Sequence, residues 1–177
     1  MTQIFGFPPI SRADAQVLIL GSMPGVMSLR LQQYYGHPQN AFWRIVGEIL
    51  GFDASLGYTQ RTVALVERKV AVWDVLEACV REGSLDSAID SASIVPNDFV
   101  GFFARHPGIR RVCFNGATAQ RMYLKQVLPN LATGSQPIEY VRLPSTSPAH
   151  AGVPFAAKVG AWRLINAQVR VGPAPKP

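Results

Sequence analysis

Four short apolar runs constrain the fold of this chain more than any other feature of its sequence. They lie at residues 17–21, 70–74, 110–115 and 138–143, and each is long enough for one strand. Segments with apolar residues at helical spacing separate them, as at Phe42, Val46 and Leu50. Strands that alternate with helices pair in parallel through right-handed crossovers. The sequence therefore predicts an α/β fold, a three-layer α/β/α sandwich with a central, mainly parallel sheet of about four strands.

Two further stripes at helical spacing occur in the second half: Phe99, Phe102 and Phe103, then Phe155, Val159, Trp162 and Val169. Pro96 and Asn97 suit the start of the first of these helices. The chain has 177 residues, of which 48% are hydrophobic and 16% are charged, a composition typical of one globular domain. We expect a single domain over residues 1–171 and a disordered tail over residues 172–177.

Targeting signals and metal motifs are missing from the sequence. No apolar run approaches the roughly 18 residues of a membrane span, and the first residues lack the basic start of a secretion signal. We therefore expect a cytoplasmic protein without membrane contact. Cys79 and Cys113 lack a CxxC partner or a nearby His, so we expect buried free thiols and no metal site.

Positive charge is concentrated in the second half of the chain. Residues 1–98 hold 7 Lys and Arg against 10 Asp and Glu, whereas residues 99–177 hold 10 against 1. A positive field attracts polyanions such as nucleic acid. Arg outnumbers Lys by 13 to 4, which suits phosphate contacts but also follows from genome base composition. Charge alone therefore favours nucleic-acid binding without deciding it.

Polar loops follow the predicted strands, at the sheet edge where α/β folds bind ligands. They read GSMPG from Gly21, a long YYGHPQNAFW segment at residues 34–43, FNG from Phe114, and LPSTSPAH from Leu143. None of them is a GxGxxG, Walker, HExxH or GxSxG motif. Amides, hydroxyls and aromatic rings together suit an unstacked nucleobase. The roles of Trp73 and Asp74 stay open, and Asp74 could cap the following turn.

These four motifs resemble the uracil-DNA glycosylase superfamily, and within it the hypoxanthine (deoxyinosine) DNA glycosylase branch. The resemblance runs from about Val17 to Ile165. The HPQNAFW stretch is also similar to the mismatch-specific uracil/thymine glycosylases. The resemblance implies base-binding residues in the first loop, at Ser22, Met23 and Gly25.

The resemblance implies that Asn40 is the catalytic residue. Better-known branches use an Asp or Asn at the place of Met23, and a thioether cannot replace it. The hypoxanthine branch uses the Asn of its HPxN stretch, which is Asn40 here. An amide can orient water and stabilise developing charge, but it cannot take a proton as a carboxylate does. The alternative is that Asn40 caps a helix beginning near Ala41.

The resemblance also assigns base contacts to two residues outside the first loop. Tyr35 aligns with the aromatic residue on which the flipped base stacks, and we expect Tyr34 to face the protein instead. Asn115 aligns with the Asn that hydrogen-bonds the base edge. The alternatives are a tyrosine on the rim and an Asn-Gly turn.

The last motif is expected to contact DNA. Ser145 and Ser147 would hold phosphates, and the loop from Thr146 to His150 would probe the gap left in the duplex. The alternative is a rigid turn bounded by prolines. Leu143 stands where the most active branch has a His, which implies slower chemistry.

The resemblance, together with these residues, implies a monofunctional DNA glycosylase that needs no cofactor. It would act as a monomer on double-stranded DNA that contains a deaminated base, preferably hypoxanthine. No lyase activity is expected, because the four lysines lie outside every motif: Lys69, Lys125, Lys158 and Lys176. One alternative is a uracil DNA glycosylase acting on G:U mismatches. The other is a catalytically weak module that binds damaged DNA.

Overall fold

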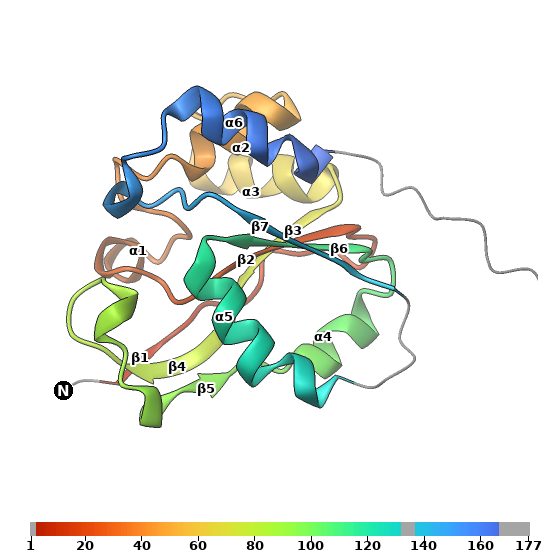
Figure 1. The fold of residues 1–177 in the computed structure, drawn as a ribbon. Coiled ribbons are helices and arrows are strands. Elements are labelled where there is room, and N and C mark those ends of the chain that lie inside the picture. Colours follow the sequence, from red (N-terminus) through yellow and green to blue (C-terminus); the bar gives the residue numbers. More distant parts are fainter. Residues whose placement is uncertain (1–2, 132–136, 167–177) are drawn as a thin grey trace, which may run out of the picture.

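The central sheet has four parallel strands, as the sequence predicts. The computed structural model describes residues 3–131 and 137–166 (Figure 1). The strands are β2 (Val17–Gly21), β3 (Val70–Asp74), β6 (Arg111–Asn115) and β7 (Glu139–Leu143), in the order β3-β2-β6-β7. Every residue of β2 and β3 is buried. Such continuous apolar runs are typical of parallel strands that are covered on both faces.

Helices cover both faces of this sheet, which confirms the three-layer α/β/α sandwich. Figure 1 shows α2 (Phe42–Leu50), α3 (Tyr58–Glu67) and α6 (Phe155–Trp162) on one side. On the other side lie α4 (Phe99–Arg105) and α5 (Ala117–Gln126). The carboxyl ends of the strands point to the left of this view, toward α1 (Val26–Leu31).

A second, smaller sheet was not predicted from the sequence. It is antiparallel, in the order β1-β4-β5, and consists of β1 (Gln3–Phe5), β4 (Leu76–Val80) and β5 (Val95–Pro96). Only Val75 separates β3 from β4, and its backbone N–H donates to the Gly21 oxygen over 2.9 Å. The apolar pattern is almost continuous across this junction, so it does not mark where one sheet ends and the next begins.

Helix boundaries differ from the expectation at two places. Asp98, rather than Pro96 or Asn97, caps α4, because its carboxylate accepts from the Gly101 N–H over 2.9 Å. The Asn97 side chain donates instead to the Asp74 backbone oxygen. The helix of the last apolar stripe ends at Trp162, where a short 3-10 helix follows α6, and the expected member Val169 lies outside the described residues, as does the predicted tail at residues 172–177.

Helices α1, α3 and α5 were not predicted, and neither were the short 3-10 helices. The 3-10 helices are η1 (Asp86–Ala88), η2 (Ser91–Ser93), η3 (Leu128–Asn130), η4 (Pro148–His150) and η5 (Arg163–Asn166). None of the helices within the described ranges is long and apolar enough to cross a membrane. Cys79 and Cys113 are both buried free thiols, as expected.

Helix α6 holds the segment that follows β7. Trp162 is fully buried, packs edge-on against Phe42 of α2, and donates its indole N–H to the Pro144 oxygen over 2.9 Å. Pro144 directly precedes Ser145, so this bond connects the helical layer to one of the polar loops. The core of the sandwich therefore sets the position of that loop.

We expect Trp162→Phe to lower the free energy of unfolding by about 1–3 kcal/mol, because it leaves the Pro144 carbonyl without its donor and removes buried volume. Urea unfolding followed by circular dichroism measures this change. Leu164→Ala is the control, because this side chain is exposed and its loss should cost less than about 0.5 kcal/mol. Equal effects of the two variants would contradict the role given to the indole.

Candidate active site

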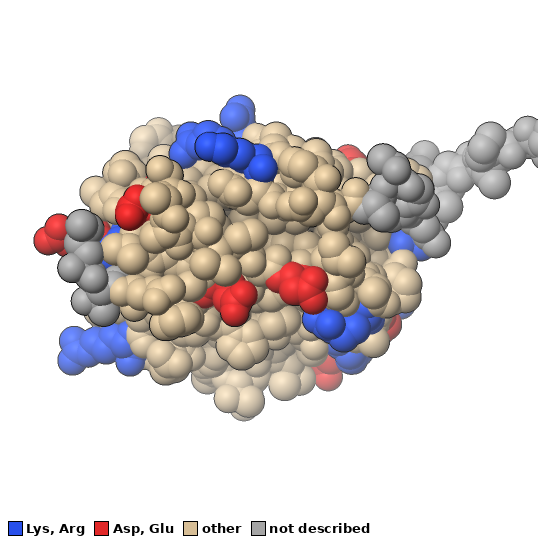
Figure 2. All heavy atoms as spheres, turned by 90° about the horizontal axis from the view of Figure 1, so that it is seen from below, with Lys and Arg blue, Asp and Glu red and all other residues tan. Residues whose placement is uncertain are grey.

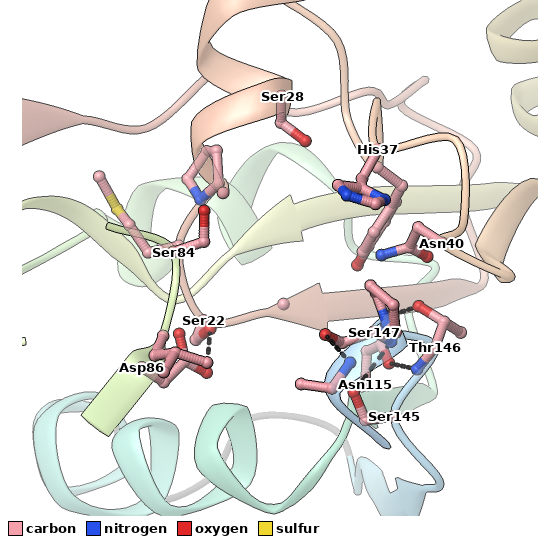
Figure 3. A pocket seen from close by; sticks show the side chains of 18 of the residues that line it. Ser22, Ser28, His37, Asn40, Ser84, Asp86, Asn115, Ser145, Thr146 and Ser147 are labelled. Carbon is pink, nitrogen blue, oxygen red and sulfur yellow. Dashed lines mark hydrogen bonds between the residues drawn. The ribbon is translucent and has the colours of Figure 1, made fainter. Parts of the chain in front are cut away.

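The loops after the four parallel strands enclose one pocket of about 350 Å³ (Figure 3). Its walls come from residues 21–28, 84–87 and 145–150, together with Tyr34, Tyr35, His37, Asn40, Asp74, Asn115 and Thr118. The lining contains every residue for which the sequence predicted a role in binding or catalysis. Sequence segments more than 100 residues apart are brought together because parallel strands end at the same sheet edge.

Asn40 is anchored through one end of its amide. Its Oδ1 accepts from the Phe42 N–H over 3.0 Å, just before α2, whose first residue is Phe42. The alternative role, in which Asn40 caps this helix, is thus partly correct: the side chain binds the first N–H of α2, although the residue at the N-cap position is Ala41. Figure 3 shows the amide nitrogen on the pocket side. The side chain therefore stabilises the helix start with its oxygen and offers N–H donors to a ligand.

The two adjacent tyrosines face different surroundings. Tyr34 is 3% exposed, and its hydroxyl donates to backbone oxygens of Phe7 and Pro8. Tyr35 has a positive φ of 55° and stacks on Phe42, with ring centroids 3.8 Å apart. Phe42 covers one face of the Tyr35 ring, and the ring contributes to the pocket wall. Burial raises the pKa of Tyr35, so its hydroxyl stays protonated.

The Asn115 amide is bound on both sides by Thr146. Its Nδ2 donates to the Thr146 hydroxyl and its Oδ1 accepts from the Thr146 N–H, both over 2.9 Å. The Thr146 oxygen accepts in turn from the Ala41 N–H over 3.0 Å. Thr146 is 1% exposed, so its polar groups connect three loops and have almost no contact with solvent.

The neighbours of Thr146 remain at the rim of the pocket. Ser145 accepts from the Ser147 N–H, and the Ser147 hydroxyl accepts from the Ala149 N–H at the start of η4. His150 is exposed, and its backbone oxygen accepts from the Lys158 ammonium over 2.9 Å. The loop is thus a rigid turn, as the alternative interpretation had it, and it also presents serine and histidine side chains at the pocket.

The wall formed by residues 84–87 was not predicted as part of the site. The Ser22 hydroxyl donates to Asp86 over 2.8 Å, and the Ser84 hydroxyl accepts from the Val26 N–H over 2.9 Å. Met23 is 6% exposed and belongs to the core as well as to the lining, and Gly25 directly precedes α1. Residues 84–87 reach the pocket through tertiary contacts with the first loop. Such contacts leave no local motif in the sequence, so sequence reasoning could not find this wall.

Asp74, whose role the sequence left open, also lines the pocket. It is the last residue of β3, it is 4% exposed, and its Oδ2 is buried without a hydrogen-bond partner. Burial raises the pKa of Asp74 to about 7; the nearby Asp86 adds to this rise, and Arg81 opposes it. A carboxyl group held in this state within a pocket is typical of a functional site.

The described Lys and Arg side chains of the second half do not line this pocket. The described lining contains Asp74 and Asp86 but no Lys or Arg. Arg121, Lys125 and Arg142 line a separate shallow groove along α5 and β7. Figure 2 shows acidic side chains near the centre of the face seen from below, and basic ones mainly at its edges. Among the described residues no three His, Cys, Asp or Glu side chains form a metal-binding group.

The fold and the site define a class of α/β protein with a base-sized, mostly uncharged pocket at the carboxyl ends of a parallel sheet. A profile of the uracil DNA glycosylase superfamily matches residues 8–165. The chain therefore belongs to this superfamily.

Individual relatives agree with this assignment. A hypoxanthine DNA glycosylase of Methanosarcina barkeri is 45% identical over 112 residues, which cover 63% of this chain and 70% of the relative. A hypoxanthine DNA glycosylase of Methanosarcina acetivorans is 43% identical over 115 residues, covering 64% and 72%. A solution structure from M. acetivorans, solved as a candidate uracil DNA glycosylase, is 34% identical with a TM-score of 0.74 and covers 94% of this chain and all of that one.

Asp74 is expected to cost stability at neutral and higher pH. Its pKa in the folded protein, about 7, exceeds the ordinary 3.8, so the folded chain keeps a proton that the unfolded chain releases. Stability attributable to this group therefore falls as the pH rises through that interval. We expect Asp74→Asn to raise the free energy of unfolding by about 1–4 kcal/mol at a pH of about 8, and less as the pH approaches 4.

Urea unfolding of both proteins across this pH range measures the difference. Glu48→Gln, on the exposed side of α2, is the charge-matched control and should show no such trend. A destabilised Asp74→Asn variant at a pH of about 8 would refute the unfavourable burial of this carboxylate.

Proposed function

We propose that this chain is a monofunctional DNA glycosylase that removes a deaminated base, preferably hypoxanthine, and leaves an abasic site. The observation that carries the proposal is the position of the Asn40 amide. The Phe42 N–H binds its oxygen, and its nitrogen faces a pocket whose amides, hydroxyls and aromatic rings suit a nucleobase. The names of the two curated relatives support hypoxanthine. The name given to the solved structure supports uracil, which is the second candidate substrate.

In the proposed reaction the flipped nucleotide is hydrolysed by water. The bond between C1′ and the base nitrogen breaks, and its electron pair leaves with the base. A water oxygen then bonds to C1′, and its proton ends on the released base. Charge develops on the base and on the sugar in the transition state, where fixed dipoles stabilise it most effectively.

Asn40 contributes to this step through its fixed amide. Because the Phe42 N–H already binds Oδ1, the amide cannot rotate freely, and its orientation is set before the substrate arrives. Its N–H groups can stabilise negative charge on the departing base. The second lone pair of Oδ1 can orient the attacking water.

Tyr35 supplies the stacking surface for the base. Phe42 supports one face of its ring at 3.8 Å, so the other face is held rigidly for a ligand. Stacking on an aromatic side chain compensates in part for the stacking that the base loses when it leaves the duplex.

Ser145, Ser147 and His150 are proposed to contact the DNA backbone at the rim. Thr146 was expected to take part in the same contacts, but its hydroxyl and backbone groups bind Asn115 and Ala41. We therefore give Thr146 the role of holding the loop that presents its neighbours. A single chain encloses the whole pocket, which is consistent with action as a monomer.

We expect Asn40→Ala to slow single-turnover release of hypoxanthine by about 10²- to 10³-fold, the usual cost of losing one preorganised donor. Asn40→Ser is the informative companion, because a serine oxygen can still accept from Phe42 but offers no amide N–H. Both variants should lose activity, while only Asn40→Ala should lose about 1 kcal/mol of stability.

The measurement is base release from duplexes with deoxyinosine, deoxyuridine or thymine opposite defined partners. Full activity of Asn40→Ser would contradict a catalytic role for the Asn40 amide and would show that this residue only stabilises the start of α2. Binding of damaged duplexes by the wild type without release of any base would favour the alternative of a weak DNA-binding module.

The product is expected to be an intact abasic site. A lyase needs an amine that can attack C1′, and none of the described lining residues is a lysine. Lys158 is 5% exposed and donates to the His150 backbone oxygen, so its amine lies behind the loop. Borohydride should therefore trap no covalent complex between the protein and a deoxyinosine duplex, whereas a trapped complex lost in Lys158→Met would refute this assignment.

A further inference from the structure

Two polar atoms at the pocket remain buried without a hydrogen-bond partner. They are Oδ2 of Asp74 and the hydroxyl oxygen of Tyr35. Both side chains line the pocket, and Asp74 is 4% exposed. Buried polar groups are nearly always paired in folded proteins, so an unpaired group in a ligand pocket indicates a partner that the ligand supplies.

Gly21 brings these two groups close to each other. A methyl group at its Cα would overlap Asp74 Oδ1 and would lie 3.2 Å from the Tyr35 hydroxyl. The carboxyl and the hydroxyl therefore approach the same point at the end of β2. A base that stacks on the Tyr35 ring would have its far edge near this point.

Asn115, the residue expected to read the base edge, is held in place by Thr146. Thr146 binds both its Nδ2 and its Oδ1 over 2.9 Å. The second Nδ2 hydrogen and the second Oδ1 lone pair of Asn115 stay available to a base, so this amide can act beside a further group. Asp74 Oδ2 has no partner to lose, so a base that binds it breaks no hydrogen bond of the protein.

We propose that Asp74 reads the base edge by accepting a hydrogen bond from the lactam N–H of a flipped, deaminated base. This inference rests on the proposed function and deepens it, because it states how the pocket separates a deaminated base from its parent. Asp74 would then be a specificity-determining residue in direct contact with substrate.

The hydrogen-bonding pattern of the bases explains the selectivity. Hypoxanthine carries N1–H beside the O6 acceptor, and uracil carries N3–H beside O4. Their parents adenine and cytosine present an unprotonated ring nitrogen beside an amino group. The ionised carboxylate, which dominates above a pH of about 7, accepts from the lactam N–H, but it faces a lone pair when the ring nitrogen is unprotonated. One acceptor therefore favours both deaminated bases and disfavours both parents.

The surroundings of Asp74 keep this acceptor available. The buried guanidinium of Arg81 donates to backbone oxygens of Gly83 and Pro24, and Asp86 binds the Ser22 hydroxyl. Neither residue has a hydrogen bond to the Asp74 side chain among the bonds of the described residues. The burial that raises the pKa of Asp74 also excludes the water that would compete with a base.

Binding of uncleavable substrates tests the inference separately from catalysis. Duplexes containing 2′-fluoro-2′-deoxyinosine or 2′-fluoro-2′-deoxyadenosine at one position are titrated at a pH of about 8, where Asp74 is mostly ionised, against the wild type, Asp74→Asn and Glu48→Gln. An Asn side chain can turn its N–H toward the adenine N1, so Asp74→Asn should reduce the preference for inosine over adenosine by about tenfold or more. Glu48→Gln should retain the preference of the wild type.

Each outcome decides between the inference and its competitors. A wild-type preference that persists within twofold in Asp74→Asn overturns the inference, and so does an equal loss of affinity for both duplexes, which indicates a structural role. The proposed function fails separately, if the wild type releases neither hypoxanthine nor uracil from unmodified duplexes. A thermal unfolding curve of Asp74→Asn verifies that the variant is folded. We expect it to unfold at a higher temperature than the wild type, because the substitution removes the buried carboxylate.

Discussion

The reciprocal pair of hydrogen bonds between Asn115 and Thr146 is the constraint on which the site depends. It ties the end of β6 to the loop after β7, and the Thr146 oxygen ties that loop to the Ala41 N–H before α2. Asn40, at the adjacent position, is thereby held at the pocket. An amide that binds both a donor and an acceptor is a rigid connection, because neither group can turn without losing its partner.

Polar groups of this site divide into those that maintain its shape and those left for a ligand. Asn115, Thr146 and the oxygen of Asn40 bind other protein groups. Asp74 Oδ2 and the Tyr35 hydroxyl do not. Groups of the first kind contribute to stability, whereas burying the second kind without partners costs free energy that binding can recover. The cost at Asp74 is consistent with the general trade-off between stability and function.

Sequence reasoning placed the pocket on the correct loops but assigned only part of the roles within them. The resemblance separated Tyr35 from Tyr34, in agreement with the hydroxyl of Tyr34 binding Phe7 and Pro8, but their local spacing alone could not. Thr146 and Ser147 are also adjacent, yet only Thr146 is buried. The neighbours of such residues come from distant segments, so local spacing carries no information about them.

The sequence by itself determined the parallel sheet, its two helical layers and the edge that carries the pocket, because the period of apolar residues and the direction of the strands decide these features. It also contained the motifs of the superfamily to which the chain belongs. Only the tertiary structure decided that Thr146 holds the Asn115 amide, that residues 84–87 close the wall, and that Asp74 Oδ2 is buried without a partner among the described residues. Burial and pairing depend on side chains that meet across loops, and these contacts exist only once the chain has folded.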